Sequence, residues 1–185
     1  TGINASNQGI YDLAVHANGD LIVAGQFNSI GGVPATCLAR WDGSVWAGIP
    51  SNLNGGVRAV VTFSNGDLIA WGSTRDIFGN RTPKLQRRSG TTWTEISTGF
   101  STTGGQFINT LAALPNGDLI AAGVFTSIGG IDASNIARYD GSTWHSMGTG
   151  IEGEVFDLAV LPNGNIAAGG TKRELYSSRI SWMRA

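Results

Sequence analysis

The sequence predicts an all-β fold made of four tandem units, and three observations lead to that prediction. The phrase "NGDLIVAG", which begins at Asn18, returns as "NGDLIAWG" at Asn65, "NGDLIAAG" at Asn116 and "NGNIAAGG" at Asn163. Tryptophan and arginine residues recur at the same spacing over the first three units. No helical period is present anywhere. A four-stranded meander of about 40 to 50 residues, repeated in tandem, is typical of a β-propeller built from antiparallel blades.

The third unit shows the expected strands most clearly. Asn-Gly between two apolar runs is a strong hairpin signal, because both residues tolerate the positive φ of a type I′ turn. It joins an expected strand over 108–114 to one over 119–125, and the second is apolar on both faces, as an inner strand should be. The segment "SIGGIDAS" is a glycine-rich connection. A second hairpin follows in "NIARYDGSTWHSMG", with its turn at Asp-Gly.

The repeat divides the chain into units of about 1–53, 54–100, 101–151 and 152–185, which we interpret as one β-propeller domain or a segment of one. The fourth unit is expected to be incomplete, with three strands, because no "DGS" hairpin follows "RISWMRA". An outer edge without a partner strand exposes unpaired N–H and C=O groups. We therefore expect a longer chain or self-association, with a closed four-bladed monomer as the alternative.

Composition excludes several partners and cofactors. Charged residues are 14% of the chain and the net charge is −1, so no nucleic acid partner is expected. Apolar runs are far shorter than the roughly 20 residues that cross a bilayer, so we expect no membrane insertion. Cys37 is the only cysteine, which excludes a disulfide framework, and its alignment with Lys84 and Asn135 suggests an exposed position. We find no metal-ligand pair, cofactor motif or standard catalytic constellation, and expect no metal or cofactor. An enzyme stays possible, because a propeller channel can assemble a site from distant strands.

The repeat pattern resembles a known group. The phrase "NGDLIAAG", a Phe, a Gly-Gly pair and then "LARWDGSVW" or "IARYDGSTW" are similar to the kelch-like propeller repeats of large secreted or surface-attached bacterial proteins. The resemblance covers nearly the whole chain. It implies a propeller that serves as a binding platform, an adhesion module or an enzyme scaffold, and an extracellular or cell-surface location. The second unit departs from the pattern in "STRDIFGNRTPKLQRRSG".

Residues that recur in each unit receive a structural interpretation. Trp46, Trp93 and Trp144 are expected to pack between blades, because a large aromatic ring at a fixed place fills the same gap each time. An aspartate after each Asn-Gly turn could pair with an arginine of the third strand and hold the register. These candidate pairs combine Asp20, Asp67 and Asp118 with Arg40, Arg87 and Arg138.

Residues that break the repeat are better functional candidates. Trp71 stands where the other units carry Ala24, Ala122 and Gly169. Its ring either compensates for poorer packing or stacks on a sugar or planar ligand. Five basic residues lie near it and form either a solvated loop or a local anion site. They are Arg75, Arg81, Lys84, Arg87 and Arg88.

Two carboxylates share one position of the first strand. Asp12 and Asp157 occur where the other units carry Ala59 and Thr110. If the ring closes, they could meet at the channel as a cation site or an acid/base pair, or they could have no joint role. His16 falls where the other units carry large apolar residues, and is expected to pack on a strand.

Two functions follow from these features. The first is a non-catalytic binding, structural or adhesion module that recognises a glycan or protein partner through loops at one end of the ring. The second is a hydrolase or lyase that acts on an extracellular polysaccharide with the carboxylates Asp12 and Asp157.

Overall fold

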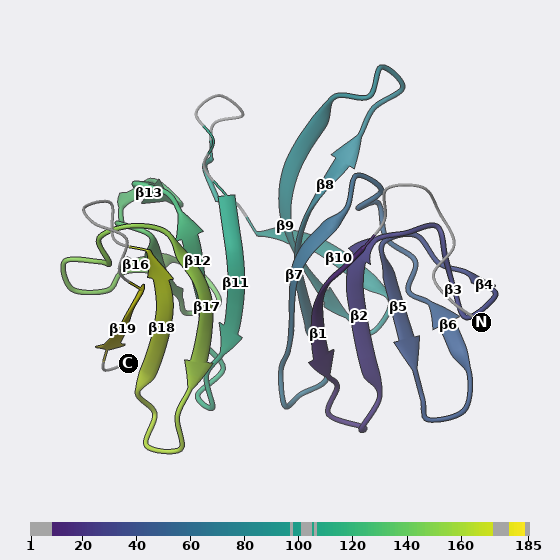
Figure 1. The fold of residues 1–185 in the computed structure, drawn as a ribbon, viewed down its shortest axis with the longest axis horizontal. Helices are drawn as coiled ribbons and strands as arrows, with labels where there is room; N and C mark the ends of the chain where they lie inside the picture. Colours follow the sequence, from purple (N-terminus) through teal and green to yellow (C-terminus); the bar gives the residue numbers. More distant parts are fainter. Residues whose placement is uncertain (1–8, 97, 101–104, 106, 172–177, 184–185) are drawn as a thin grey trace. The chain divides into compact units, whose positions relative to one another are not determined.

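The computed structural model describes residues 9–96, 98–100, 105, 107–171 and 178–183. The chain forms two compact units, unit 1 over Thr1–Ile96 and unit 2 over Ser97–Ala185. Every regular element in the described residues is a β-strand (Figure 1). The all-β prediction is therefore confirmed.

Unit 1 contains two four-stranded antiparallel sheets. Sheet 1 is formed by β1 (Gly9–Val15), β2 (Leu21–Gln26), β5 (Leu38–Trp41) and β6 (Trp46–Gly48). A small hairpin, β3 (Ser29–Ile30) and β4 (Val33–Pro34), lies between β2 and β5 in the chain. Sheet 2 is formed by β7 (Val57–Thr62), β8 (Leu68–Arg75), β9 (Arg81–Ser89) and β10 (Thr92–Ile96). Both sheets are meanders in chain order, as predicted.

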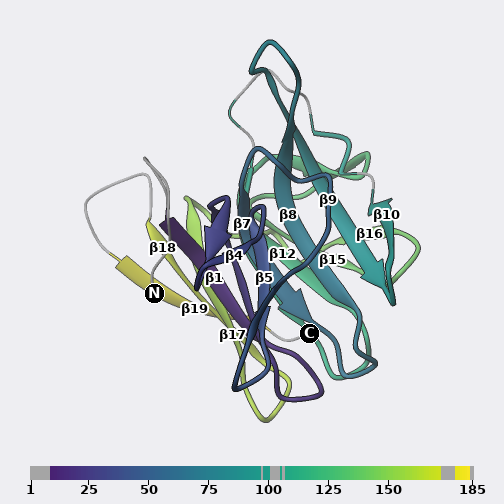
Figure 2. The same ribbon diagram turned by 90° about the vertical axis from the view of Figure 1, so that its right-hand side faces the viewer.

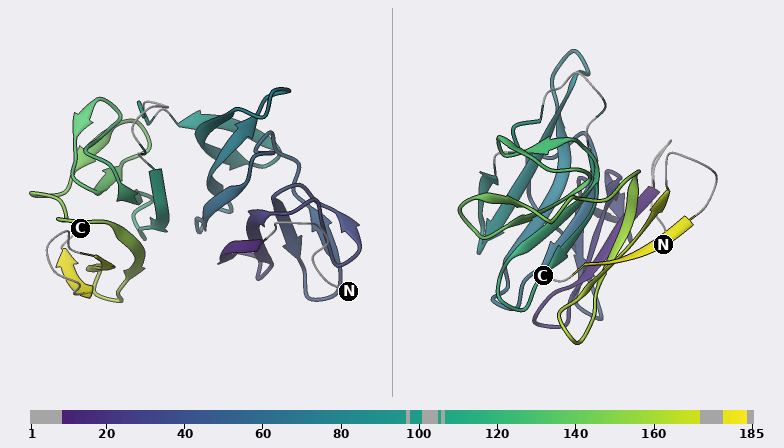
Figure 3. Two further views of the ribbon diagram at one scale, coloured as in Figure 1. Left: turned by 45° about the horizontal axis from the view of Figure 1, so that its top comes forward. Right: turned by 90° about the vertical axis from the view of Figure 1, so that its left-hand side faces the viewer.

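Unit 2 repeats the arrangement. Sheet 3 is formed by β11 (Phe107–Ala113), β12 (Leu119–Val124), β15 (Ile136–Tyr139) and β16 (Trp144–Ser146), with a small hairpin of β13 (Ser127–Ile128) and β14 (Ile131–Asp132). Sheet 4 is three-stranded, in the order β17 (Val155–Val160), β18 (Ile166–Thr171) and β19 (Ser178–Met183). Figure 3 shows these last strands, drawn yellow-green to yellow, as one sheet. Three strands are what the repeat predicts for the fourth unit.

The sheets pack face to face within each unit. In unit 1, Ile22 and Ala24 of β2 share a buried cluster with Leu68 and Ala70 of β8. In unit 2, Ile120 and Ala122 of β12 pack with Ile166 and Ala168 of β18 in the same way. Inner strands that are apolar on both faces bury their side chains on both sides, and this explains the continuous apolar run of the repeated phrase. Val23, which lies between Ile22 and Ala24, is accordingly buried as well.

The last glycine of the repeated phrase allows a β-bulge. In each sheet the register between the first two strands shifts once, at Tyr11, Arg58, Asn109 and Phe156. A Cβ on the glycine opposite the bulge would lie closer than 3.0 Å to a carbonyl oxygen of the first residue of the first strand or of the residue before it. The glycines are Gly25, Gly72, Gly123 and Gly170. The phrase therefore ends in glycine for a steric reason, because a bulge bends one strand toward its neighbour.

The aspartate of the phrase forms the expected ion pair within its own sheet. Arg40 Nη1 lies 2.9 Å from Asp20 Oδ2, and Arg138 Nη1 lies 2.6 Å from Asp118 Oδ2. Arg87 pairs with Asp67 in sheet 2. In sheet 4 the aspartate is replaced by Asn165, and the position opposite Ala167, which an arginine occupies in the other sheets, is Trp182. Both members of the pair are thus replaced together.

The expectation for the tryptophans is correct for one of them and wrong for another. Trp93 packs against the core between sheets 1 and 2, and its Nε1 donates to Pro50 O at 2.7 Å. Trp46 instead packs into a cluster formed by sheet 1 itself, where its ring lies against Gly31. Trp144 lies against Gly129 of its own unit in the same manner. Spacing alone did not distinguish these two environments.

His16 bridges the turns of sheets 1 and 2. Its Nε2 lies 2.9 Å from Gly66 O and its Nδ1 lies 2.8 Å from Asn18 Oδ1. The ring follows the end of β1, so it ties two neighbouring Asn-Gly turns together and does not pack on a strand as expected.

Candidate functional site

The hairpin of β8 and β9 is where unit 1 departs most from its repeat. Its ladder runs from Leu68 opposite Arg88 to Arg75 opposite Arg81. In sheet 1 the matching ladder between β2 and β5 ends at Ala24 opposite Leu38. The hairpin therefore projects beyond the other strands of unit 1 (Figures 1 and 2).

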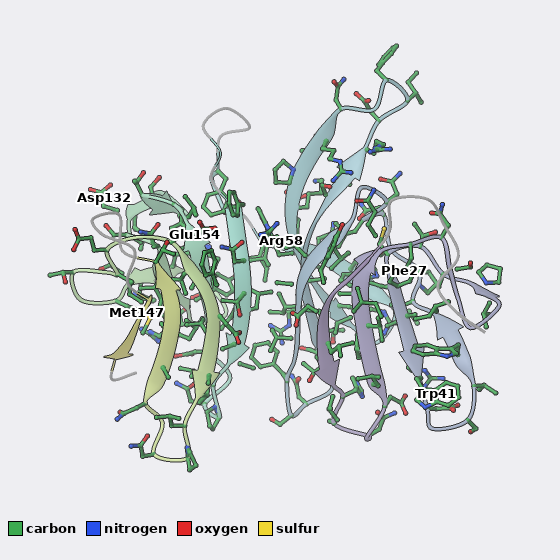
Figure 4. All side chains as sticks on the ribbon, viewed as in Figure 1. Phe27, Trp41, Arg58, Asp132, Met147 and Glu154 are labelled. Carbon is green, nitrogen blue, oxygen red and sulfur yellow. The ribbon has the colours of Figure 1, made fainter. Side chains whose placement is uncertain are left out.

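In sheet 1 the segment between the second and third strands folds back onto the sheet. Phe27 (Figure 4) and Ile30 are 1% and 4% exposed, in one cluster with Trp46. Gly31 has φ +59° and lies against the Trp46 ring, closer than a side chain would allow. An aromatic anchor and a glycine under the tryptophan thus hold the segment down. Phe125, Ile128 and Gly129 repeat this arrangement in sheet 3.

In sheet 2 the same segment has lost both anchors. Thr74 stands in place of Phe27, and Phe78 stands in place of Gly31. In the folded-back conformation, Phe78 would need a positive φ and its side chain would collide with the tryptophan of the repeat. Sheet 2 therefore cannot adopt that conformation. Lys84 stands in place of Cys37 and Asn135, whose φ values of +64° and +62° end the ladder in sheets 1 and 3. Without that bend, β8 and β9 continue to pair as far as Arg75 and Arg81.

The tip of the hairpin exposes two large apolar side chains. Ile77 is 93% exposed and Phe78 is 83% exposed. Asp76 fixes the turn beneath them, since its Oδ1 accepts the N–H groups of Phe78 and Asn80, each at 2.9 Å. Hydrogen bonds, led by the one from the Asn80 side chain, hold the pKa of Asp76 below its usual range. The turn is therefore held by an ionised carboxylate at neutral pH.

Two arginines flank the tip directly opposite each other. Arg75 and Arg81 are cross-strand partners, and both are exposed. Within the described residues, neither guanidinium has a carboxylate within ion-pair distance. The end of β8 beside the tip is fixed to the loop that precedes β7, because Arg75 N donates to Asn54 Oδ1 at 2.6 Å and Asn54 Nδ2 donates to Arg75 O at 3.3 Å. Like charges opposite each other are unfavourable unless an anion lies nearby.

The other basic residues of the predicted anion site have different surroundings. Lys84 pairs with Glu95, and Arg87 pairs with Asp67. Arg88 has a buried Nε that no hydrogen-bond partner reaches among the described residues. The structure thus separates the five predicted cations into two that are compensated, one that is partly buried and two, Arg75 and Arg81, that face solvent.

Trp71 and Cys37 are both buried. Trp71 is 3% exposed and lies opposite Leu85 in the ladder, so its ring presents no open face for stacking. Cys37 is 2% exposed, which corrects the expectation of an exposed position. Burial raises the pKa of its thiol, with opposing contributions from Phe27, Gly56 and Arg81. Its alignment with Lys84 was misleading because sheet 2 has a different local structure there.

The two candidate channel carboxylates each bind backbone or hydroxyl groups. Asp12 accepts the N–H of Leu13 at 2.8 Å and that of Val60 in sheet 2 at 2.7 Å. Asp157 accepts the N–H of Leu158 at 2.8 Å and the hydroxyl of Thr110 at 3.4 Å. Each therefore links the first strands of two packed sheets within its own unit. Their pairing across the two units stays a prediction.

Sequence reasoning did not single out Ile77 and Phe78. The signal was present, because Phe78 replaces a glycine of the Gly-Gly pair in an otherwise regular repeat. Among the described residues, no group of three or more histidine, cysteine or acidic side chains could hold a metal ion. The described part of the chain also contains no helix long and apolar enough to cross a membrane.

Comparison with known proteins agrees with the architecture. Residues 16–41 and 114–142 match the family model described as "Domain of unknown function (DUF5122) beta-propeller". The matched segments run from the Asn-Gly turn to the third strand in sheets 1 and 3, the two sheets with a folded-back hairpin. No curated protein matches the chain. The family match and the all-β sheets together support a β-propeller, with the number of blades still a prediction.

Proposed function

We propose that this chain is a non-catalytic binding module that holds a protein partner with the tip of the β8–β9 hairpin. The observation that carries the proposal is the exposure of Ile77 and Phe78 at the end of a fixed, projecting turn. A folded chain gains nothing in its own stability from two large apolar side chains in water. Covering them with an apolar pocket contributes about 1.5–3 kcal/mol for each side chain.

The rigidity of the hairpin supports recognition by this tip. Asp76 and the bonds between Asn54 and Arg75 hold the loop in one conformation before any partner arrives. A preformed loop loses little conformational entropy when it binds, so more of the burial energy contributes to affinity. Aromatic and arginine side chains also dominate the binding energy of known interfaces. Phe78, Arg75 and Arg81 place those residue types together.

A protein partner fits this surface better than a glycan. Trp71 was the candidate stacking surface for a sugar, and that ring is 3% exposed. Ile77 and Phe78 together form a projecting apolar surface, which can bind in a hydrophobic pocket of another protein. Asp12 and Asp157 are each engaged by backbone N–H groups, which favours a structural role for them over an acid/base role.

We also propose that the module acts at the cell surface or outside the cell. The similarity of its repeats to those of secreted and surface-attached propellers supports this location. Fractionation of the source cells, with immunodetection of the chain in the surface and medium fractions, tests it. Detection in the cytoplasmic fraction alone would contradict it.

Affinity capture with matched variants tests the binding function. The intact chain, the double variant Ile77→Ser/Phe78→Ser and the control Val45→Ser are immobilised and exposed to proteins of the source organism. Val45 is also an exposed apolar residue of unit 1, 59% exposed, but it lies in the turn between β5 and β6. We expect to capture partners that bind the wild type and Val45→Ser in equal amounts. The amount captured by the double variant should be at least tenfold lower.

Circular dichroism of all three proteins checks that folding is unchanged. The substituted side chains are solvent-exposed, so their replacement should leave the spectra and melting temperatures alike. Recovery of the same partners by the double variant would show that the hairpin tip is not the contact.

A further inference from the structure

Three side chains from three strands meet beside the projecting hairpin. Tyr11 lies on the bulge of β1, Gln26 ends β2, and Arg81 begins β9. Tyr11 Oη and Arg81 Nη2 each lie 3.5 Å from the same atom, Gln26 Oε1. Two donors that come from different strands therefore converge on one oxygen.

Both contacts are longer than well-formed hydrogen bonds. O–H···O bonds centre near 2.7–2.8 Å and N–H···O bonds near 2.9–3.0 Å, so at 3.5 Å each donor makes only a weak interaction. Tyr11 is 53% exposed, and Arg81 is exposed as well. Both donors therefore point toward the Gln26 amide oxygen, but neither forms a strong hydrogen bond with it. A charged oxygen would bind there more strongly, because charge-assisted hydrogen bonds are shorter and about twice as strong as neutral ones.

The local charges favour a single carboxylate. Arg75 stands opposite Arg81 in the ladder, and within the described residues neither has an acidic partner. Asp76 follows Arg75 in the chain, but its oxygens accept hydrogen bonds from the backbone and side chain of its own turn. A guanidinium fork matches the planar geometry of a carboxylate group.

We propose that Tyr11, Gln26 and Arg81 form a carboxylate-binding site, which takes an acidic side chain of the protein that covers Ile77 and Phe78. Arg81 and Tyr11 donate to the two carboxylate oxygens, while the Gln26 amide turns to present its NH₂ group. The source of the carboxylate rests on the proposed function. The site itself rests only on the convergence of the two donors, so it can be tested without any partner.

Acetate is the probe for the first test. The intact chain, labelled with ¹⁵N, is titrated with sodium acetate at constant ionic strength against sodium chloride, and the Arg Nε–H and Gln side-chain signals are followed by NMR. We expect saturable shifts of the Arg81 and Gln26 signals. Arg81→Gln should abolish the Gln26 response, while the control Arg75→Gln, on the opposite strand of the hairpin, should keep it. Loss of the response in both variants, or no response in the wild type, would overturn the site.

A second variant places the anion within the protein. Gln26→Glu puts a carboxylate where the amide oxygen lies, so it should occupy the two donors and remove the response to acetate. A Gln26→Glu protein that responds to acetate like the wild type would overturn the proposal. This test also separates the two proposals. Acetate binding without any effect of Ile77→Ser/Phe78→Ser on partner capture would retain the site and reject the hairpin function, and the reverse result would do the opposite.

Discussion

Sheets 1 and 2 differ in the conformation of one segment, which has the same length in both. Between the second and third strands, sheet 1 folds the chain back and buries Phe27 and Ile30, whereas sheet 2 extends it and exposes Ile77 and Phe78. The frame around the segment is shared, since both sheets keep the Asn-Gly turn, the ion pair and the bulge. A few substitutions in a regular repeat are therefore enough to convert a segment that packs on its own sheet into one that exposes apolar side chains to solvent. Three predictions test this comparison.

The largest expected effect is at Gly31. Gly31→Ala forces a side chain onto a residue with φ +59° and against the Trp46 ring. We expect a loss of about 3 kcal/mol in the free energy of unfolding, which combines backbone strain with a core collision. Urea denaturation measures it. Gly32→Ala is the matched control, because Gly32 also has a positive φ, +85°, but has no atom near the added Cβ. Equal losses in both variants would show that Trp46 does not hold the segment down.

An intermediate effect is expected at the aspartate–arginine ion pair, which sheets 1 and 2 share. Burial would raise the pKa of Asp67, but hydrogen bonds from Arg87, Ser89 and Asn65 outweigh it and hold the pKa below the usual range. Its stabilisation is therefore present above the ordinary aspartate pKa and is lost as pH falls through the lowered one. Asp67→Asn should cost about 1–2 kcal/mol at neutral pH, since Arg87 is partly solvated.

A double-mutant cycle with Arg87→Gln isolates this pair by urea denaturation at pH 7 and at pH 3. We expect a favourable coupling free energy at pH 7, which decreases at pH 3 to the extent that Asp67 becomes protonated. No coupling at pH 7, or a larger coupling at pH 3, would contradict a register-holding ion pair.

The smallest effect is a gain in stability. Cys37 and Asn135 share a positive φ. The Asn135 side chain accepts from Phe125 N and donates to Ile151 O, each at 2.9 Å, whereas the Cys37 thiol meets the backbone of Phe27 and Gly56 as a weaker hydrogen-bonding group. Cys37→Asn should raise the free energy of unfolding by about 0.5–1 kcal/mol, because asparagine adopts this conformation more readily and can repeat both bonds. Thermal melting with the reciprocal variant Asn135→Cys checks it. We expect the two changes to have opposite signs.

The predictable part of the molecule is the part with local signals. Asn-Gly dipeptides between apolar runs located every first hairpin, and regular spacing located the three ion pairs. The position of Trp46 was not predictable from spacing, because a recurrent ring can face its own Gly-Gly pair or a neighbouring sheet. Cys37 was misjudged because its alignment partner Lys84 belongs to a refolded segment.

The candidate site was only partly predictable. Its basic residues were noticed as a cluster, but their individual partners depend on strand register, which separates Lys84 and Arg87 from Arg75 and Arg81. The convergence of Tyr11 and Arg81 on Gln26 joins residues from three strands across two sheets. No linear pattern contains that information.

The conformation of residues 74–82 is the central claim, and NMR of the intact chain tests it most directly. We predict cross-strand NOEs between the Thr74–Thr82 and Arg75–Arg81 pairs, together with strong relaxation of the Ile77 and Phe78 signals by a soluble paramagnetic agent. NOEs between the Phe78 and Trp93 rings, with both apolar side chains protected from the agent, would show that sheet 2 folds its segment back as sheet 1 does, and would contradict the account.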